Sequence, residues 1–206
     1  MLEAITYENM LKDIKNNEIL EDTIGILITR PDLTTGKNIL DSLPYFHHLT
    51  GHSINFYLPG YGAYWNTATY PDKHDVVTID GTTWSFSNIA FINFINDLED
   101  STSWIYSGES ELLLISYKDK TLDFTSVSLF KLDQMLKDNT ISSISAFFTQ
   151  LSRFARKHQS NTVVSTKIGT THITKSLLQD FINSLPTYIS TTIKDGKHFV
   201  SHDYSK

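Results

Sequence analysis

The sequence contains no cysteine. This absence excludes a disulfide framework, a thiolate zinc site, an iron–sulfur cluster and a cysteine nucleophile. The sequence also lacks any apolar run that approaches the roughly 20 residues of a transmembrane helix. Residues 1 to 20 are acidic and amphipathic, whereas a signal peptide begins with basic residues and continues with apolar ones. We therefore expect a cytoplasmic protein with no membrane partner.

Basic residues are scarce, because 17 Lys and Arg stand against 23 Asp and Glu, which gives a formal net charge of −6. A negative chain is poorly suited to phosphate backbones, so we expect no nucleic-acid partner. Charged residues make up only 19% and hydrophobic residues 40%, which is typical of folded globular proteins. The abundance of Asn, Ile, Lys, Phe and Tyr is typical of an AT-rich microbial, for instance bacterial, coding sequence.

The 206 residues are enough to surround one hydrophobic core. We expect a single α/β domain over residues 1–206, with a mixed β-sheet, a βαβ unit and flanking helices. Its parts are an N-terminal helix at 1–20, a core at 23–158, and a C-terminal hairpin, helix and tail at 159–206.

Hydrophobic periodicity predicts the order of elements within this domain. An apolar, β-branched run at 23–29 predicts a buried strand, and a helix at 37–50 that contains Pro44 separates it from a second strand at 52–58. Asp80-Gly81 predicts a hairpin between 76–79 and 82–86. The remaining pattern predicts a helix at 88–99 capped by Ser87, strands at 111–117 and 122–130, a helix over about 141–155, a hairpin within 159–172, a helix from Thr174, and a polar tail from Lys194 that frays.

Without the hairpin, this succession resembles the thioredoxin-like core, in which a βαβ half joins a ββα half across a mixed sheet. The family carries two redox cysteines at the start of its first core helix, where this chain has Thr34-Thr35-Gly36-Lys37. The family also keeps a cis-proline just before the strand that begins here at Glu111, and this chain has no proline there. The resemblance therefore implies the fold and no redox chemistry. The alternative topology is an open, Rossmann-like, doubly wound sheet.

The first candidate site follows the first predicted core strand, at residues 30–38. Backbone N–H groups at a helix start can hold phosphate, and a lysine there can neutralise it. Pro31 stands where a phosphate-binding loop has its first glycine, and Asn38 stands where it has a Ser or Thr, so the pattern favours a Thr-capped helix entry. Any ligand bound at this strand end is expected to present an anionic group to Arg30, Thr35 and Lys37.

The second candidate site is an aromatic stretch at 57–75, which includes Tyr61, Tyr64 and Trp65. Tyrosine and tryptophan are enriched where proteins bind partners, and we expect a protein partner here. The alternative is a loop that folds back over the edge of the sheet. Asp72, His74 and Asp75 at its end also offer an acid and a base to a bound substrate.

Histidines gather at His47, His48 and His52. Neighbouring residues on a helix project about 100° apart, and Gly51 separates the third histidine from the other two, so this cluster does not suit zinc. We expect no metal site and interpret these histidines as helix-end residues, where a positive charge is favoured.

The sequence contains no nucleophile paired with a base, no complete phosphate-binding motif and no metal-ligand spacing, and it indicates no cofactor. We therefore predict a non-catalytic binding or interaction domain, as a subunit or regulatory part of a microbial intracellular assembly. Its ligand-binding residues are predicted to be Arg30, Thr35, Lys37, Tyr61, Tyr64 and Trp65. The alternative is an enzyme or sensor that acts on a nucleotide or phosphorylated small molecule at residues 30–38.

Overall fold

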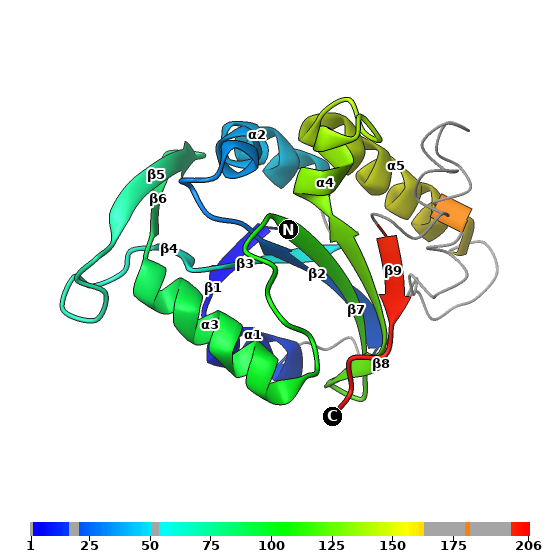
Figure 1. Cartoon of the computed structure of the whole chain (residues 1–206), viewed down its shortest axis with the longest axis horizontal. Helices are drawn as coiled ribbons and strands as arrows, with labels where there is room; N and C mark the ends of the chain where they lie inside the picture. Colours follow the sequence, from blue (N-terminus) through cyan, green and yellow to red (C-terminus); the bar gives the residue numbers. More distant parts are fainter. Residues whose placement is uncertain (1, 17–20, 51–53, 163–179, 182–198) are drawn as a thin grey trace.

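The computed structural model describes residues 2–16, 21–50, 54–162, 180–181 and 199–206 (Figure 1). Its strands are β1 (Leu2–Ile5), β2 (Glu21–Ile28), β3 (Asn55–Pro59), β4 (Tyr61–Ala63), β5 (His74–Ile79), β6 (Thr82–Phe86), β7 (Glu111–Lys118), β8 (Thr121–Lys131) and β9 (Phe199–His202). Its helices are α1 (Tyr7–Asn16), α2 (Thr34–Thr50), α3 (Asn88–Ser101), α4 (Leu132–Lys137) and α5 (Ile144–Thr162). Among these described helices, none has the length and hydropathy that crossing a bilayer requires.

A six-stranded mixed sheet forms the centre of the molecule, in the order β1-β3-β2-β7-β8-β9. β1 and β2 both run parallel to β3, whereas β7 is antiparallel to β2, β8 to β7, and β9 to β8. β2, α2 and β3 therefore form the predicted βαβ unit. The predicted mixed α/β architecture with flanking helices is confirmed.

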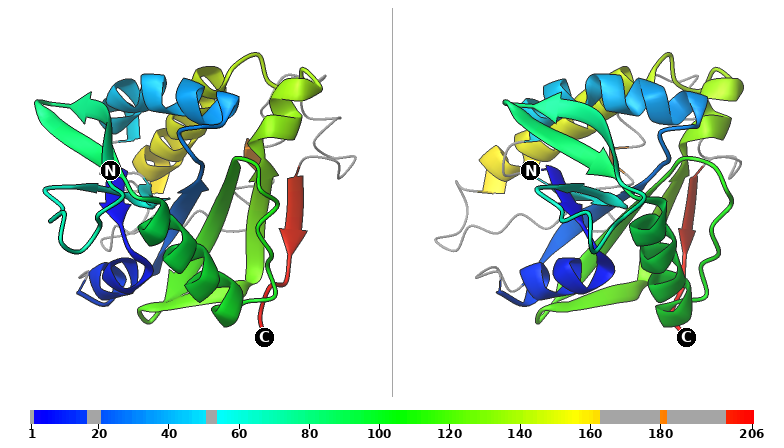
Figure 2. Two further views of the ribbon diagram at one scale, coloured as in Figure 1. Left: turned by 60° about the vertical axis from the view of Figure 1, so that its left-hand side comes forward. Right: turned by 90° about the vertical axis from the view of Figure 1, so that its left-hand side faces the viewer.

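Helices cover both faces of this sheet, with α2 and α5 on one face and α1 and α3 on the other (Figures 1 and 2). The alternation of side chains along β3 explains this arrangement. Phe56 packs edge-on against Phe148 of α5, with ring centroids 5.6 Å apart. Its neighbour Tyr57 points to the opposite face, where its hydroxyl donates a 2.5 Å hydrogen bond to Asp13 of α1. Phe56 and Tyr57, two successive residues of β3, therefore contact helices on opposite faces of the sheet.

The buried strand β2 confirms the prediction made from its β-branched run. Ile24, Ile26 and Ile28 are at most 1% exposed. Gly25 lies opposite Phe56 in the parallel register, and a Cβ at Gly25 would approach the Phe56 ring to 2.4 Å. A larger residue at this position would therefore displace the Phe56 ring and the packing of α5.

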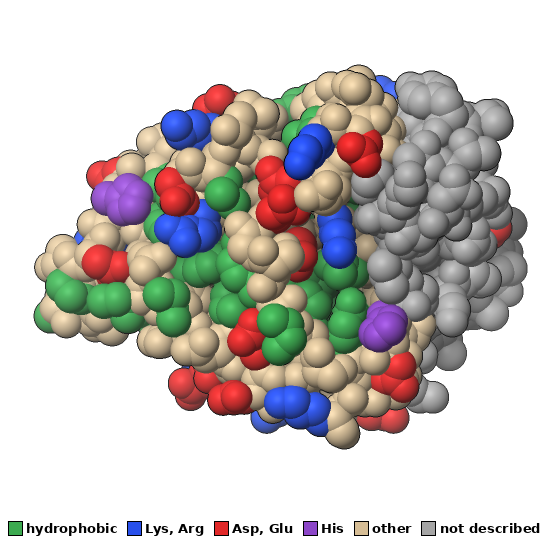
Figure 3. All heavy atoms as spheres, in the orientation of Figure 1, with side chains coloured by type: hydrophobic (Ala, Val, Ile, Leu, Met, Phe, Trp, Pro, Cys, Tyr) green, Lys and Arg blue, Asp and Glu red, His purple; other side chains and the backbone are tan. Residues whose placement is uncertain are grey.

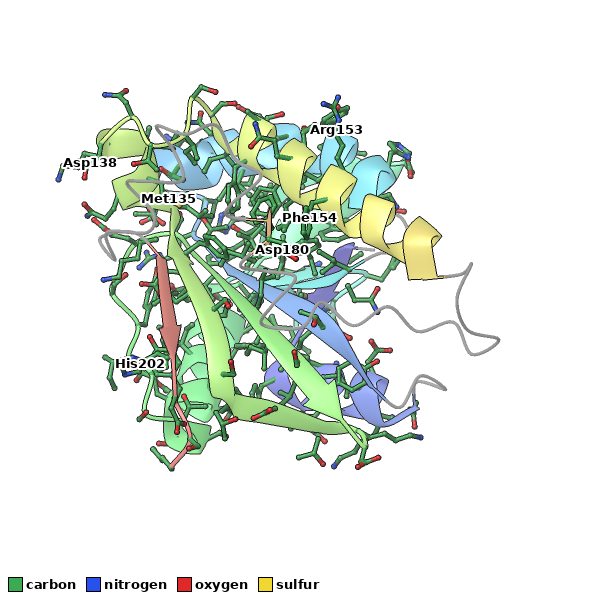
Figure 4. All side chains as sticks on the ribbon, turned by 90° about the vertical axis from the view of Figure 1, so that its right-hand side faces the viewer. Met135, Asp138, Arg153, Phe154, Asp180 and His202 are labelled. Carbon is green, nitrogen blue, oxygen red and sulfur yellow. The ribbon has the colours of Figure 1, made fainter. Side chains whose placement is uncertain are left out.

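The amphipathic pattern of α5 separates its buried and exposed faces. Figure 4 shows Phe154 directed toward the sheet and Arg153 directed away from it on the same helix. Phe154 packs against Phe181, with ring centroids 5.4 Å apart, and Phe181 is 1% exposed. Phe181 belongs to the helix predicted from Thr174, of which only residues 180–181, both helical, are described.

A second, three-stranded sheet has the order β4-β6-β5 and follows β3 in the chain. Asp80 and Gly81 connect β5 to β6 with positive φ angles of 49° and 76°. These angles match the two-residue turn that the Asp-Gly pair predicts, so the hairpin is confirmed. The aromatic stretch at 57–75 contains the short strand β4, because Tyr61 pairs with Phe86 of β6.

The predictions for the two ends of the chain differ from the structure. Residues 2–5, predicted as part of an N-terminal helix, form β1, because Leu2 to Ile5 pair in parallel register with β3. Residues 199–202, predicted to fray, form β9 at the other edge of the sheet, where His202 lies opposite Val127. Both segments are short, and each is ordered by a strand that is distant in the sequence.

Several predicted elements extend beyond the described residues. The start of the strand predicted at 52–58 lies partly outside them, and β3 begins at Asn55. Of the hairpin predicted within 159–172, residues 159–162 are part of α5, and the remainder lies outside. α2 contains Pro44 as predicted, and it begins earlier than predicted, at Thr34.

Candidate functional site

A cleft of about 370 Å³ opens where the central sheet meets the three-stranded sheet. We call it the strand-end cleft, and it is lined by Arg30, Pro31, Asp32, His74, Phe86 and Asn88. Residues 30–32 follow β2, His74 begins β5, Phe86 ends β6, and Asn88 begins α3. Three chain segments therefore converge at the carboxyl end of a buried central strand, which is a frequent position for ligands in α/β folds.

The wall that follows β2 is a tight turn closed by its own side chains. The N–H of Leu33 donates to the carbonyl of Arg30 at 3.2 Å. The Arg30 guanidinium donates two hydrogen bonds of 3.0 Å to the two carboxylate oxygens of Asp32. Gly36 packs directly beneath this turn, since a Cβ on it would lie 1.8 Å from the Arg30 carbonyl oxygen. The turn is therefore held against the first turn of α2.

Asp133, for which the sequence predicts no role, connects this turn to the start of β7. One carboxylate oxygen accepts a 2.5 Å hydrogen bond from the hydroxyl of Thr35, and the other accepts a short hydrogen bond from the N–H of Ser110. The hydroxyls of Ser110 and Thr29 lie 2.8 Å apart and share a further hydrogen bond. Thr35, predicted to contact a ligand, is thus engaged inside the protein, and an internal carboxylate lies at the N-terminus of α2.

Tyr61, also predicted to contact a ligand, is fully buried. Its hydroxyl donates to the carbonyl of Thr29 at 3.3 Å, and its ring packs 4.9 Å from the ring of Phe86. Burial raises the pKa of Tyr61 well above its usual range, and the charge of Asp32 raises it further. Tyr61 therefore supports the floor of the strand-end cleft behind Phe86.

Tyr64 and Trp65 lie on the strand β4 side of the small sheet and, like Lys37, are not among the described residues that line the cleft. Tyr64 is 90% exposed and has a positive φ of 60°. Trp65 packs on the ring of Tyr70, with centroids 4.5 Å apart. Lys37 is exposed in the first turn of α2. Of the six predicted ligand-binding residues, only Arg30 lines the cleft itself.

A buried carboxylate, Glu111, lies at the start of β7 and was not selected from the sequence as a site residue. It is 1% exposed and faces Lys131 across the antiparallel pair of β7 and β8. Burial raises the pKa of Glu111, while the hydroxyl of Ser107, the indole N–H of Trp104 and the charge of Lys131 oppose the rise. Glu111 Oε2 and Trp104 Nε1 nevertheless form no hydrogen bond of good geometry within the described part of the chain.

The hydroxyl of Tyr106 is influenced both by the charge of Glu111 and by the charges of Arg30 and Asp32 in the strand-end cleft. Burial raises the pKa of Tyr106 to about 12. The charge of Arg30 lowers this pKa, whereas the carboxylates of Glu111, Asp133 and Asp32 raise it. Figure 3 shows acidic side chains gathered in the middle of this face of the molecule. These interactions place Arg30 among several carboxylates.

The first turn of α3 forms the opposite wall of the cleft and is capped by two side chains. Ser87 accepts a 3.1 Å hydrogen bond from the N–H of Ala90, as the sequence predicts. Asp72 accepts 2.7 Å and 2.9 Å hydrogen bonds from the hydroxyl of Ser87 and the N–H of Ile89. Slight burial raises the pKa of Asp72, but these hydrogen bonds outweigh that effect and lower it below the usual value.

The neighbouring histidines His47 and His48 face the tip of the β5–β6 hairpin. Their Nε2 atoms lie 3.6 Å and 3.3 Å from the two carboxylate oxygens of Asp80. His52, the third member of the predicted cluster, lies outside the described residues. Within the described ranges, no group of three His, Asp or Glu side chains is arranged to hold a metal ion.

No family model matches this chain, and no curated protein or solved structure matches it. The chemistry of the strand-end cleft is therefore the basis for assigning a function.

Proposed function

We propose that this chain is a non-catalytic, protein-binding domain that holds a segment of its partner in the strand-end cleft. The observation that carries the proposal is that the cleft combines the two stretches selected from the sequence. Arg30, Pro31 and Asp32 belong to the strand-end loop at 30–38, and His74 belongs to the aromatic stretch at 57–75.

Apolar side chains exposed on α3 beside the cleft, and on the small sheet, support a protein partner. Ile89 and Ile92 on one face of α3 are 43% and 46% exposed, and Tyr64, whose hydroxyl lies 3.3 Å from that of Thr82, is 90% exposed. Figure 3 shows hydrophobic side chains at the surface over the loop between β4 and β5 and over the beginning of α3. Exposed aromatic and aliphatic residues next to a concave site are typical of protein interfaces.

Two carboxylates of the protein itself weigh against the alternative, in which an enzyme or sensor binds a phosphorylated small molecule here. A helix N-terminus attracts phosphate through its free N–H groups and positive dipole. Asp133 already lies at the start of α2, and Asp72 caps the start of α3. Arg30 is also held by Asp32. The donors that would bind a phosphate in the cleft are therefore already paired with carboxylates. The negative charge of these carboxylates would repel the phosphate.

We propose further that the fold is a variant of the thioredoxin-like core. In support, β3, β2, β7 and β8 are adjacent in that order, with β2 and β3 parallel and with β7 and β8 antiparallel. The Rossmann-like alternative requires parallel strands where β7 and β8 are antiparallel. In this proposal, β4, β5 and β6 are an insertion between β3 and α3, and the insertion builds one side of the cleft.

A selection of random peptides displayed on phage, with the purified protein as bait, tests the proposed function. Asn88→Trp fills the cleft from α3, and Asn93→Trp places the same side chain at an exposed position further along α3. Selected peptides are expected to bind the wild type and Asn93→Trp alike and to lose at least about tenfold in affinity for Asn88→Trp, which corresponds to about 1.4 kcal/mol. Circular dichroism verifies that both variants are folded.

Two outcomes would contradict the proposal. Peptides that bind Asn88→Trp as well as the wild type would place the binding site elsewhere. Failure to enrich any peptide, together with a nucleotide-induced rise in melting temperature that Lys37→Ala abolishes, would establish the enzyme or sensor alternative.

A further inference from the structure

We infer that the partner segment held in the strand-end cleft is basic, with a lysine or arginine side chain that contacts Asp32. This inference rests on the proposed function and specifies the chemistry of its ligand. It reverses the expectation that a ligand at this strand end is anionic.

The arrangement of Asp32 is the first support. Its side chain is 61% exposed, whereas that of Arg30 is 39% exposed. Each carboxylate oxygen of Asp32 accepts one hydrogen bond from Arg30. A carboxylate oxygen can accept two hydrogen bonds, so Asp32 retains acceptor capacity toward the cleft while it holds Arg30. A cationic partner can thus bind without breaking an existing contact.

The charges behind the cleft are the second support. Asp32, Asp133 and Glu111 all act on the hydroxyl of Tyr106, and Arg30 is the cation that opposes them there. Glu109 adds a further carboxylate next to Glu111, and Lys131 adds one cation. At the hydroxyl of Tyr61, the effect of Asp32 exceeds the opposing effect of Arg30. Arg30 has the largest single charge effect on Tyr106, but three carboxylates act against it there, so carboxylates outnumber cations behind the cleft.

The apolar walls of the cleft are the third support. Phe86 is 3% exposed, and the ring of His74 packs edge-on against it with centroids 5.9 Å apart. Together with Pro31, these rings form a surface along which the methylene groups of a lysine or arginine can lie. Aromatic rings also attract a cation placed over their faces. Walls and charge thus both match a long basic side chain.

An acidic partner segment would encounter opposite conditions. It would have to displace Asp32 from Arg30 and then remain beside that carboxylate. The net charge of −6 would also repel an acidic partner at a distance and attract a basic one. The basic segment is therefore favoured both in the cleft and during the approach.

Fluorescence anisotropy with two labelled synthetic peptides, Gly-Phe-Lys-Gly-Lys-Phe-Gly and the same peptide with glutamates in place of the lysines, tests the inference. The wild type is expected to bind the lysine peptide at least about tenfold more tightly, the effect of one charge-assisted contact. Raising the salt concentration from 50 to 300 mM is expected to reduce this difference, because salt screens exposed charges.

Two charge variants and one control sharpen the test. Asp32→Asn is expected to weaken the lysine peptide at least about fivefold, and Arg30→Gln is expected to strengthen it, because removing the cation leaves Asp32 free. Asp97→Asn makes the same charge change at an exposed position near the other end of α3 and is expected to have no effect.

The inference is overturned if the glutamate peptide binds more tightly, or if Arg30→Gln weakens the lysine peptide. It is also overturned if both peptides bind equally, or if neither binds. The phage-display selection tests the proposed function separately. If the selected peptides distinguish Asn88→Trp from Asn93→Trp, the cleft binds segments of another charge and only the basic partner is rejected. If they do not, both proposals fail.

Discussion

Glu111 is the residue whose position is least expected from general rules of burial. A carboxylate at the start of a central strand is rarely 1% exposed unless it has well-placed partners. Lys131 faces it across the strand pair, but burial still raises the pKa of Glu111. Because the raised pKa means that the folded state binds the proton more tightly, this group costs stability above its folded pKa. The cost decreases as the pH falls toward the unfolded pKa.

Replacing Glu111 by glutamine is therefore expected to stabilise the protein at pH 8 by about 1 kcal/mol, since the amide keeps the shape without the buried charge. Urea unfolding between pH 5 and pH 8 measures the effect, and the gain is expected to shrink toward pH 5. Glu8→Gln, at an exposed position of α1, is the control and is expected to change little. A loss of stability at pH 8 would mean that the contacts with Lys131, Trp104 and Ser107 outweigh the burial.

At the scale of a single element, α3 shows how a cap both stabilises a helix and shapes the site. Asp72 is distant from the helix in the chain, yet it accepts hydrogen bonds from Ser87 and from the N–H of Ile89. These bonds satisfy donors that a helix start leaves free. They also hold Asn88, which lines the strand-end cleft, next to the end of the aromatic stretch.

Asp72→Ala is expected to lower the free energy of unfolding by about 0.5–1 kcal/mol at pH 7, a range that allows for solvent screening of a largely exposed group. The pKa of Asp72 is lowered in the folded state, so its contribution is present above the ordinary value of 3.8 and is lost as the pH falls through the folded value. Urea unfolding at pH 7 and pH 3 checks this expectation. An equal difference between variant and wild type at both pH values would argue against the charged cap.

At the scale of the whole molecule, Asp133 connects three elements that are distant in the sequence. It belongs to α4, contacts Thr35 of α2, and accepts a hydrogen bond from Ser110, which immediately precedes β7. The same contacts place the turn after β2 beside the start of β7. The strand-end cleft and the carboxylates behind it therefore depend on one shared side chain.

Asp133→Ala is expected to reduce the free energy of unfolding by about 2–4 kcal/mol, because it leaves a buried hydroxyl and a backbone N–H without their charged acceptor. Chemical denaturation at pH 7 measures the loss. Asp97→Ala, on the exposed side of α3, is the control and is expected to stay within about 0.5 kcal/mol of the wild type. A loss below about 1 kcal/mol for Asp133→Ala would show that the three elements are held together by other contacts.

Features that depend on neighbouring residues were predictable from the amino-acid sequence alone. The β-branched run around Ile26, the Asp80-Gly81 turn and the Ser87 cap all have local signals, and each lies in the predicted element. The absence of cysteine likewise restricts the chemistry without any knowledge of the fold. Such features are predictable because the conformational preference resides in the residues themselves.

Which distant residues meet depends on the packing of the whole fold. β1 and β9 are strands because β3 and β8 offer them free edges, and an isolated segment of four residues carries no sign of such a partner. The burial of Tyr61, the bridge formed by Asp133, and the convergence of Arg30 with His74 and Phe86 have the same origin. Contacts between residues far apart in the chain depend on how the sheets and helices pack, and sequence periodicity reports only which face of an element is apolar.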